Sequence, residues 1–164
     1  MIIFWIIVCL VLCFGFVVLV GAPYVPTLKE QQHDALDLLD LKKGQTLLEL
    51  GSGDGRMLRA AAQRGIHAVG YELNPFLVIV SYIVCFKYRH QISIRWGNFW
   101  QKEWPITDGI YVFLLQKFMA NLDTKITQQY AGKKVKVVSY AFEIPGKNPN
   151  KRKGALALYQ YGPK

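Results

Sequence analysis

Charge is missing from the first part of the chain. No Asp, Glu, Lys or Arg stands between Met1 and Leu28, and the first basic residue is Lys29. The stretch Ile2–Val20 is almost wholly apolar, and a helix of about 20 apolar residues crosses a hydrocarbon core of roughly 30 Å. A cleaved secretory leader would need a basic start and an apolar run of only about 7–15 residues. We therefore expect a retained transmembrane helix over residues 1–22, with a buried core helix as the alternative.

Cysteine and histidine are also scarce, and their spacing matches no metal site. The three residues of each kind are Cys9, Cys13 and Cys85, and His33, His67 and His90. Two of the cysteines fall in the predicted membrane helix and the third lies in an apolar stretch, so neither a disulfide framework nor a zinc site is expected. The histidines stand singly, without the spacing of metal ligands. We predict no metal cofactor.

Acidic residues are outnumbered, since 20 Lys and Arg face 11 Asp and Glu and give a formal net charge of +9. Residues 23–164 are expected to form one domain. All the basic residues follow the apolar segment, so the positive-inside rule predicts that this domain lies on the cytoplasmic side of a membrane, or on the matrix side in a mitochondrion. Apart from a cluster at Lys147–Lys153 the basic residues are scattered. We expect attraction to anionic lipid headgroups, and not to nucleic acid, with a solvated basic face as the alternative.

Apolar runs alternate with helical patterns through the rest of the chain. The expected strands cover residues 46–50, 67–71, 92–95, 110–115, 135–140 and 155–161, and the expected helices cover 27–41, 56–64, 76–88 and 119–130. This alternation predicts an α/β domain with a mostly parallel sheet and helices on both faces. Beyond residue 140 there is room only for a basic loop, 146–154, and one strand, so the C-terminal part is minimal.

The most specific motif joins the first strand to the helix that follows it. The segment Glu49–Arg56 reads Glu-Leu-Gly-Ser-Gly-Asp-Gly-Arg and has three glycines on alternate positions. Gly51 allows a sharp exit from the strand, Gly53 lets a ligand approach the main chain, and Gly55 lets the following helix lie close to the strand. Such a turn presents backbone N–H groups to a ligand. We predict a nucleotide-type site, against the alternative of an ordinary strand-to-helix turn.

The ligand follows from the details of this loop. A dinucleotide fingerprint reads G-x-G-x-x-G, but here the third glycine comes one residue earlier. A carboxylate at Glu49 would repel a diphosphate and attract an ammonium or a sulfonium. The loop resembles motif I of the class I S-adenosyl-L-methionine-dependent methyltransferases, E/D-x-G-x-G-x-G. This resemblance implies a Rossmann-like methyltransferase fold and S-adenosyl-L-methionine as the cofactor, held by Glu49, Gly51, Ser52, Gly53 and Gly55.

A second acidic residue ends the second expected strand. Glu72 follows Gly51 by about 20 residues, the position from which a carboxylate accepts the ribose hydroxyls in nucleotide-binding folds. An acidic residue at a strand end is common by chance and would be weak evidence for a ribose contact. Together with the glycine loop, it is strong evidence. Leu73 and Asn74 are then expected to border the adenine.

After the third expected strand, Asn98 can accept the adenine amino group through its side-chain carbonyl, and Phe99 can pack on the ring. The alternative for this pair is a turn with buried aromatics. Farther on, the segment Leu115–Phe118 lacks the Asn-Pro-Pro-Tyr type signature of many DNA-base methyltransferases. Its absence argues against methylation of bases.

Three stretches narrow the resemblance: Pro23–Thr27, Leu50–Arg56 and Gly70–Val78. With the uncharged N-terminal segment, they resemble the membrane-anchored lysine methyltransferases that act on the ATP synthase c-subunit and the adenine nucleotide translocase, and their prokaryotic relatives. The resemblance implies N-methylation of a lysine on a membrane-embedded or membrane-bound protein. Tyr24 and Gln116 are the candidates for lining the acceptor site. No general base can be named from the sequence.

Three alternatives remain open at this point. The chain could methylate a small molecule or a lipid. It could be a nucleotide-dependent oxidoreductase, which the early third glycine and Glu49 disfavour. It could also be a non-catalytic, membrane-tethered module that binds a partner through its basic face.

Overall fold

The computed structural model describes residues 1–5, 7–8, 11, 15 and 28–163. Within these ranges no helix is both long enough and apolar enough to cross a membrane. The transmembrane helix predicted over residues 1–22 falls mostly on positions outside the described ones, as does Tyr24. Both therefore stay predictions, and so does the domain boundary between residues 22 and 23.

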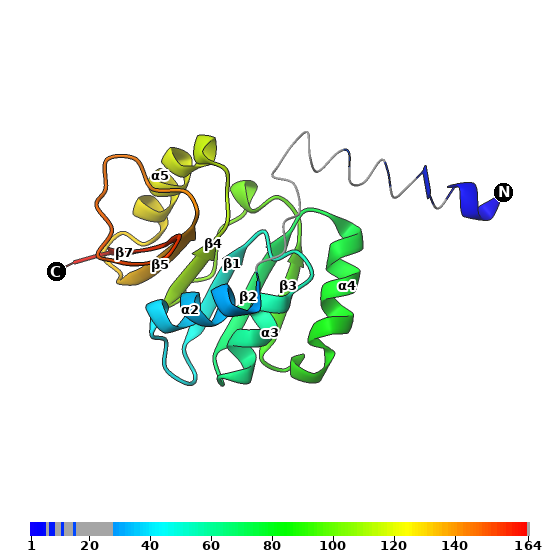
Figure 1. The fold of residues 1–164 in the computed structure, drawn as a ribbon, viewed down its shortest axis with the longest axis horizontal. Helices are drawn as coiled ribbons and strands as arrows, with labels where there is room; N and C mark the ends of the chain where they lie inside the picture. The colour runs from blue at the N-terminus through cyan, green and yellow to red at the C-terminus, as the bar shows by residue number, and fades with distance from the viewer. Residues whose placement is uncertain (6, 9–10, 12–14, 16–27, 164) are drawn as a thin grey trace.

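The described residues form one seven-stranded sheet in the order β3-β2-β1-β4-β5-β7-β6 (Figure 1). The strands are β1 (Thr46–Leu50), β2 (His67–Glu72), β3 (Ile92–Trp96), β4 (Gly109–Val112), β5 (Val135–Tyr140), β6 (Lys151–Lys153) and β7 (Leu156–Tyr161). The first five strands pair in parallel, whereas β7 runs antiparallel to both β5 and β6. The predicted α/β fold with a mostly parallel sheet is confirmed.

Helices cover both faces of this sheet. The helices are α2 (Lys29–Leu39), α3 (Arg56–Gln63), α4 (Pro75–Cys85) and α5 (Met119–Gln129), with short 3-10 turns at Phe86–Tyr88, Phe99–Gln101 and Gln116–Phe118. Buried side chains of α2, α3 and α4 share one apolar cluster with the sheet, and those of α5 share a second cluster on the other face. Because the central strands are buried from both sides, β1 reads as a run of apolar residues interrupted only by Glu49.

Asp108 lies at the amino end of the strands and has a structural role there. Its Oδ2 accepts a hydrogen bond from the Thr46 N–H at 2.8 Å, and its Oδ1 accepts one from Gln45 Nε2 at 3.1 Å. The carboxylate therefore joins the starts of β1 and β4, far from the ends where ligands bind in parallel sheets.

The C-terminal part differs from the expected single strand. Lys151–Lys153, which we expected to be part of a basic loop, pairs with β7 as β6. Its three side chains are all exposed, so no apolar alternation marks this strand in the sequence. Two other boundaries also shift: β4 ends at Val112 instead of residue 115, and α4 ends at Cys85 instead of residue 88.

Candidate functional site

The glycine loop has the backbone geometry that its sequence predicts. Gly51, Gly53 and Gly55 have φ angles of 84°, 55° and 78°, values that side chains other than glycine rarely adopt. The N–H groups of Gly51 and Ser52 both donate to the Tyr71 carbonyl at 2.9 Å. The loop is thus fixed to the end of β2, directly above the carboxyl end of β1.

Gly55 has a different packing role from the expected one. A Cβ atom at this position would collide with Ser81 Oγ and would lie 2.9 Å from Cys85 Sγ, both on α4. The close approach is therefore between the start of α3 and the next helix, and not between α3 and its own strand. Gly55 sets the distance between α3 and α4.

Glu72 connects three segments of the site. Its Oε2 accepts a hydrogen bond from the Gly53 N–H and its Oε1 accepts one from the Asn74 N–H, both at 2.8 Å. Its backbone carbonyl accepts from the Gly97 N–H at 2.9 Å. Burial raises the pKa of Glu72 above its ordinary value, while the two N–H donors counteract that rise by stabilising the charged form.

Glu49 lies on β1 between Gly70 of β2 and Tyr111 of β4, and only 5% of it is exposed. Its Oε2 is buried and has no hydrogen-bond partner among the described residues. Burial raises the pKa of Glu49 well above its ordinary value, and the nearby charges of Asp54 and Glu72 raise it further. A cationic ligand placed beside this buried group would stabilise its charged form.

Two further side chains, Asn74 and Ser52, also have buried polar atoms without a hydrogen-bond partner among the described residues. Asn74 is completely buried and caps α4, because its Oδ1 accepts from the Phe76 N–H at 2.9 Å. Its Nδ2 has no partner among the described residues, and the same holds for the buried Ser52 Oγ. Buried polar atoms of this kind are usually satisfied by water or by a ligand.

The segment after β3 is joined to the end of β2 by the hydrogen bond from the Gly97 N–H to the Glu72 carbonyl. Asn98 is half-buried, and its Oδ1 already accepts from the Trp100 N–H at 3.0 Å. Phe99 packs 4.7 Å from the Trp100 ring, measured between ring centres. Leu73 is half-buried and its carbonyl accepts from Trp96 Nε1 at 3.1 Å. The expected contacts of these residues with an adenine stay predictions.

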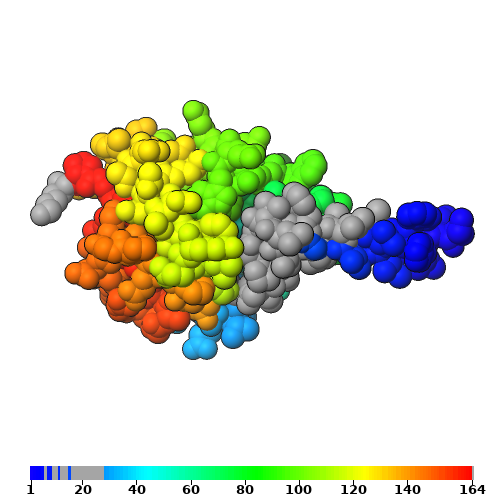
Figure 2. All heavy atoms as spheres, turned by 90° about the horizontal axis from the view of Figure 1, so that it is seen from above, coloured from blue at the N-terminus to red at the C-terminus, as the bar shows by residue number. Residues whose placement is uncertain are grey.

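The carboxyl ends of β4 and β5 lie on the same edge of the sheet as the carboxyl end of β1. Gln116 is exposed, and its Nε2 donates to the Glu143 carbonyl at 3.1 Å. It thereby joins the segment after β4 to the one after β5. In the space-filling view the yellow residues before and in α5 lie beside the orange residues that follow β5 (Figure 2).

Tyr140, the last residue of β5, is not among the site residues predicted from the sequence. Its hydroxyl accepts from Gln31 Nε2 at 2.7 Å, and its ring meets Phe113 edge to face at 4.8 Å between centres. The next residue, Ala141, has a φ of 67°, which is rare for a residue with a side chain. The rule that ligands bind at the carboxyl ends of parallel strands could have marked Tyr140.

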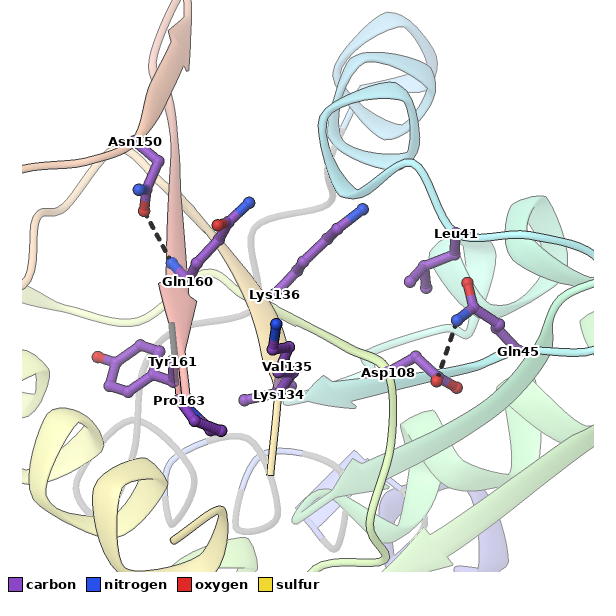
Figure 3. A pocket seen from close by; sticks show the side chains of 11 residues that line it. Leu41, Gln45, Asp108, Lys134, Val135, Lys136, Asn150, Gln160, Tyr161 and Pro163 are labelled. Atoms are coloured by element: carbon purple, nitrogen blue, oxygen red, sulfur yellow. Dashed lines mark hydrogen bonds between the residues drawn. The ribbon is translucent and has the colours of Figure 1, made fainter. Parts of the chain in front are cut away.

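A cavity of about 560 Å³ lies elsewhere, at the amino ends of β1 and β5. Leu41, Gln45 and Asp108 line one side of it and Lys134, Lys136 and Gln160 the other (Figure 3). It shares no residue with the glycine loop or with Glu72. The cavity is therefore separate from the site described above.

Comparisons with known proteins identify the family. The model of the ANTKMT methyltransferase domain matches residues 49–151. The ATP synthase c-subunit lysine N-methyltransferase of Homo sapiens is 29% identical over 130 residues, which cover 78% of this chain and 55% of that protein. The chain thus spans about half the length of this curated relative. The protein-lysine N-methyltransferase of Saccharolobus islandicus is 30% identical over 131 residues, which cover 77% of this chain and 81% of that one.

Among solved structures, an RNA methyltransferase from Salinibacter ruber in complex with S-adenosyl-L-homocysteine superposes with a TM-score of 0.75. It is 26% identical, and the match covers 84% of this chain and 92% of that one. The expected Rossmann-like methyltransferase fold is confirmed by this likeness. Since the family model spans the glycine loop, Glu72 and Asn98, this chain belongs to the ANTKMT methyltransferase domain family.

Proposed function

We propose that the chain is an S-adenosyl-L-methionine-dependent protein-lysine N-methyltransferase whose acceptor is a membrane-embedded or membrane-bound protein. The observation that carries this proposal is the family match across residues 49–151, which includes both buried carboxylates of the site. The Saccharolobus islandicus relative, which this chain matches over 81% of its length, is a protein-lysine N-methyltransferase. The substrate class comes from these relatives, and the cofactor fit comes from the site itself.

The residues at the carboxyl edge fit S-adenosyl-L-methionine. The Oε2 of Glu49, buried and without a described partner, suits the amino-acid ammonium or the sulfonium. Glu72 keeps acceptor capacity for ribose hydroxyls beyond its two N–H donors, since a carboxylate offers about four lone-pair sites. A Cβ at Gly51 would meet nothing within 4 Å, so the main chain is open on that side. The cofactor is S-adenosyl-L-methionine, as the sequence predicts.

When bound, S-adenosyl-L-methionine supplies a methyl group on a sulfonium, a good leaving group, so placing the amine in line accounts for most of the acceleration. The protein must also favour the neutral form of the acceptor lysine, whose ordinary pKa is about 10.4. Desolvation lowers that pKa. Phe113 and Tyr140 offer an apolar wall for this purpose, and the Tyr140 oxygen has a second lone pair for an amine N–H.

The N-terminal segment is proposed to hold the domain on a membrane. Residues 1–28 contain no charged side chain, and Ile2, Ile3 and Phe4 are exposed. A single span over residues 1–22 would keep residues 23–164 on the side with more basic residues, the cytoplasm or the mitochondrial matrix. Lipid contact through this segment would bring the site to acceptors in the same membrane.

The test is methyl transfer to a membrane fraction. The full chain is incubated with membranes and tritium-labelled S-adenosyl-L-methionine, and samples are then treated with protease, with nuclease or with lipid solvent. We expect label that protease removes and that amino-acid analysis finds on lysine. Label removed by nuclease would favour the RNA class named for the Salinibacter ruber neighbour. Label in the solvent phase would favour a lipid acceptor, and no label would favour the non-catalytic module.

A further inference from the structure

Helix α4 is apolar on its outer side as well as on its inner side. It has no charged residue from Pro75 to Cys85. Leu77, Val78 and Cys85 are buried on its inner side. On its outer side and just beyond its end, four exposed side chains follow the helical spacing i, i+3, i+4 and i+7: Ile79, Tyr82, Ile83 and Phe86. A helix that is apolar all round is normally covered on both sides.

The edge strand beside this helix extends the apolar surface. Trp96, at the end of β3, is 67% exposed. The Tyr82 hydroxyl donates to the Ile94 carbonyl of β3 at 3.0 Å, so helix and strand form one continuous surface. Among the labelled helices, α4 lies farthest out on the β3 side of the sheet (Figure 1). We call Ile79, Tyr82, Ile83, Phe86 and Trp96 the α4 face.

The sequence segment that carries the α4 face has charged residues of one sign only. From residue 73 to residue 102 the sequence contains no Asp or Glu and four basic residues: Lys87, Arg89, Arg95 and Lys102. The Arg89 guanidinium lies 4.8 Å from the centre of the Phe86 ring, so a cation borders the apolar stripe directly. Lys87 lies 5.8 Å from the ring of Tyr88 in the same turn.

We propose that the α4 face docks on the surface of an anionic lipid bilayer, as a second membrane contact besides residues 1–22. Acyl chains would cover the aliphatic side chains, and headgroup phosphates would pair with Lys87 and Arg89. Trp96 and Tyr82 are the residue types that favour the lipid–water interface. A second copy of the chain fits less well, because a two-fold interface brings the same cations of both copies together.

This docking orients the reactive edge of the domain. Helix α4 starts directly after Glu72 and Asn74, which belong to the cofactor site. With the α4 face on the lipid, the carboxyl ends of the strands would stay close to the headgroups, where the side chains of a membrane protein emerge. The inference does not depend on the methyl-transfer reaction, and its test does not measure it.

Trp96 serves as the reporter. The full chain is reconstituted into vesicles of brominated phosphatidylcholine with phosphatidylglycerol, and its fluorescence is compared with that of Trp96→Phe to isolate the Trp96 signal. We expect bromine to quench most of this signal, and quenching to weaken clearly when phosphatidylglycerol is left out. The double variant Ile79→Glu/Ile83→Glu should lose the quenching. Ile106→Glu, an exposed isoleucine outside the face, should retain it.

Three results would overturn the proposal: no quenching in any vesicle, equal quenching without phosphatidylglycerol, or quenching that survives in the double variant. Sedimentation that finds a dimer in the parent chain and a monomer in Ile79→Glu/Ile83→Glu would assign the face to a second copy instead. Unchanged thermal unfolding of the double variant shows that the fold is intact. Flotation of the vesicles with bound protein reports separately on residues 1–22, so failure of that span is distinguishable from failure of the α4 face.

Discussion

The carboxylate of Glu72 accepts a hydrogen bond from the Gly53 N–H, with 2.8 Å between Oε2 and the nitrogen. This bond joins the end of β2 to the glycine loop after β1. The other buried carboxylate of the site, Glu49, has an oxygen without any described partner. The two acidic residues therefore differ in what they do for the ligand-free fold, and this difference can be measured.

Replacing Glu72 by Gln is expected to destabilise the chain. An amide has one carbonyl oxygen in place of two carboxylate oxygens, so one of the N–H donors, at Gly53 or Asn74, would face an NH₂ group. Leaving a buried donor unpaired lowers the free energy of unfolding by about 1–3 kcal/mol. Urea denaturation measures this difference. The exposed Glu103→Gln is the matched control and should leave stability unchanged; equal effects of the two variants would contradict the assignment.

Replacing Glu49 by Gln is expected to have the opposite effect on the ligand-free chain. Burial raises the pKa of Glu49 in the fold, so the unfolded chain releases this proton at a lower pH than the folded chain does. The contribution of this group to stability is complete below the unfolded pKa of about 4.3 and is lost as the pH rises towards the folded pKa. Glu49→Gln should therefore be more stable than the parent by about 1–3 kcal/mol near pH 8.

The pH dependence supplies the control for this prediction. Near pH 3 Glu49 is protonated in both states, so the parent and Glu49→Gln should unfold at nearly the same urea concentration. A constant difference between the two proteins over the whole pH range would contradict a raised pKa. The same variant should bind S-adenosyl-L-methionine at least about tenfold more weakly, because it lacks the charge that pairs with the ligand cation.

The glycine loop was the part of the site that the sequence predicted best, because its geometry depends on local backbone rules. Three glycines with positive φ stand where the motif requires them. Asn98 was less predictable: its expected acceptor oxygen is already bonded to the backbone of Trp100. Tyr140 could not be assigned from its neighbours in the sequence, since its partners Gln31 and Phe113 come from distant segments.

Strands that contain apolar residues were predictable from the sequence, whereas the wholly basic β6 was not. β1 and β5 are apolar runs and were found at the expected residues, Thr46–Leu50 and Val135–Tyr140. β6 has three exposed basic residues and forms only because the turn at Gly154, with a φ of 56°, folds it back on β7. Local propensity contains no sign of such a pairing, which depends on the neighbouring strand.

Replacing Gly55 by Ala should separate α3 from α4. The added Cβ would collide with Ser81 Oγ, and the φ of 78° would be strained as well. We expect a loss of about 2–6 kcal/mol, because backbone strain alone costs about 1–3 kcal/mol and overpacking adds a similar amount. Gly44→Ala isolates the strain, since Gly44 has a φ of 86° and nothing within 4 Å of an added Cβ. Adding Ser81→Ala to Gly55→Ala should recover part of the loss; no recovery would contradict this packing.

Replacing Tyr140 by Phe tests the acceptor half of the site. We expect the Tyr140 hydroxyl to accept a hydrogen bond from the amine N–H of the substrate. Without it, the rate of methyl transfer should fall by about tenfold, equivalent to about 1.4 kcal/mol, while the affinity for the cofactor stays unchanged. Gln31→Ala breaks the same hydrogen bond from its other side and leaves the hydroxyl in place. Equal losses in the two variants would mean that the bond only holds α2 in position.

The most direct measurement is calorimetric titration of the full chain in detergent with S-adenosyl-L-methionine and, separately, with NAD. We predict that only S-adenosyl-L-methionine binds, that Glu49→Gln and Glu72→Gln both weaken its binding, and that Glu103→Gln does not. Binding of NAD alone, or binding of S-adenosyl-L-methionine with the same affinity in Glu49→Gln and Glu72→Gln as in the parent chain, would contradict the assignment of the cofactor site.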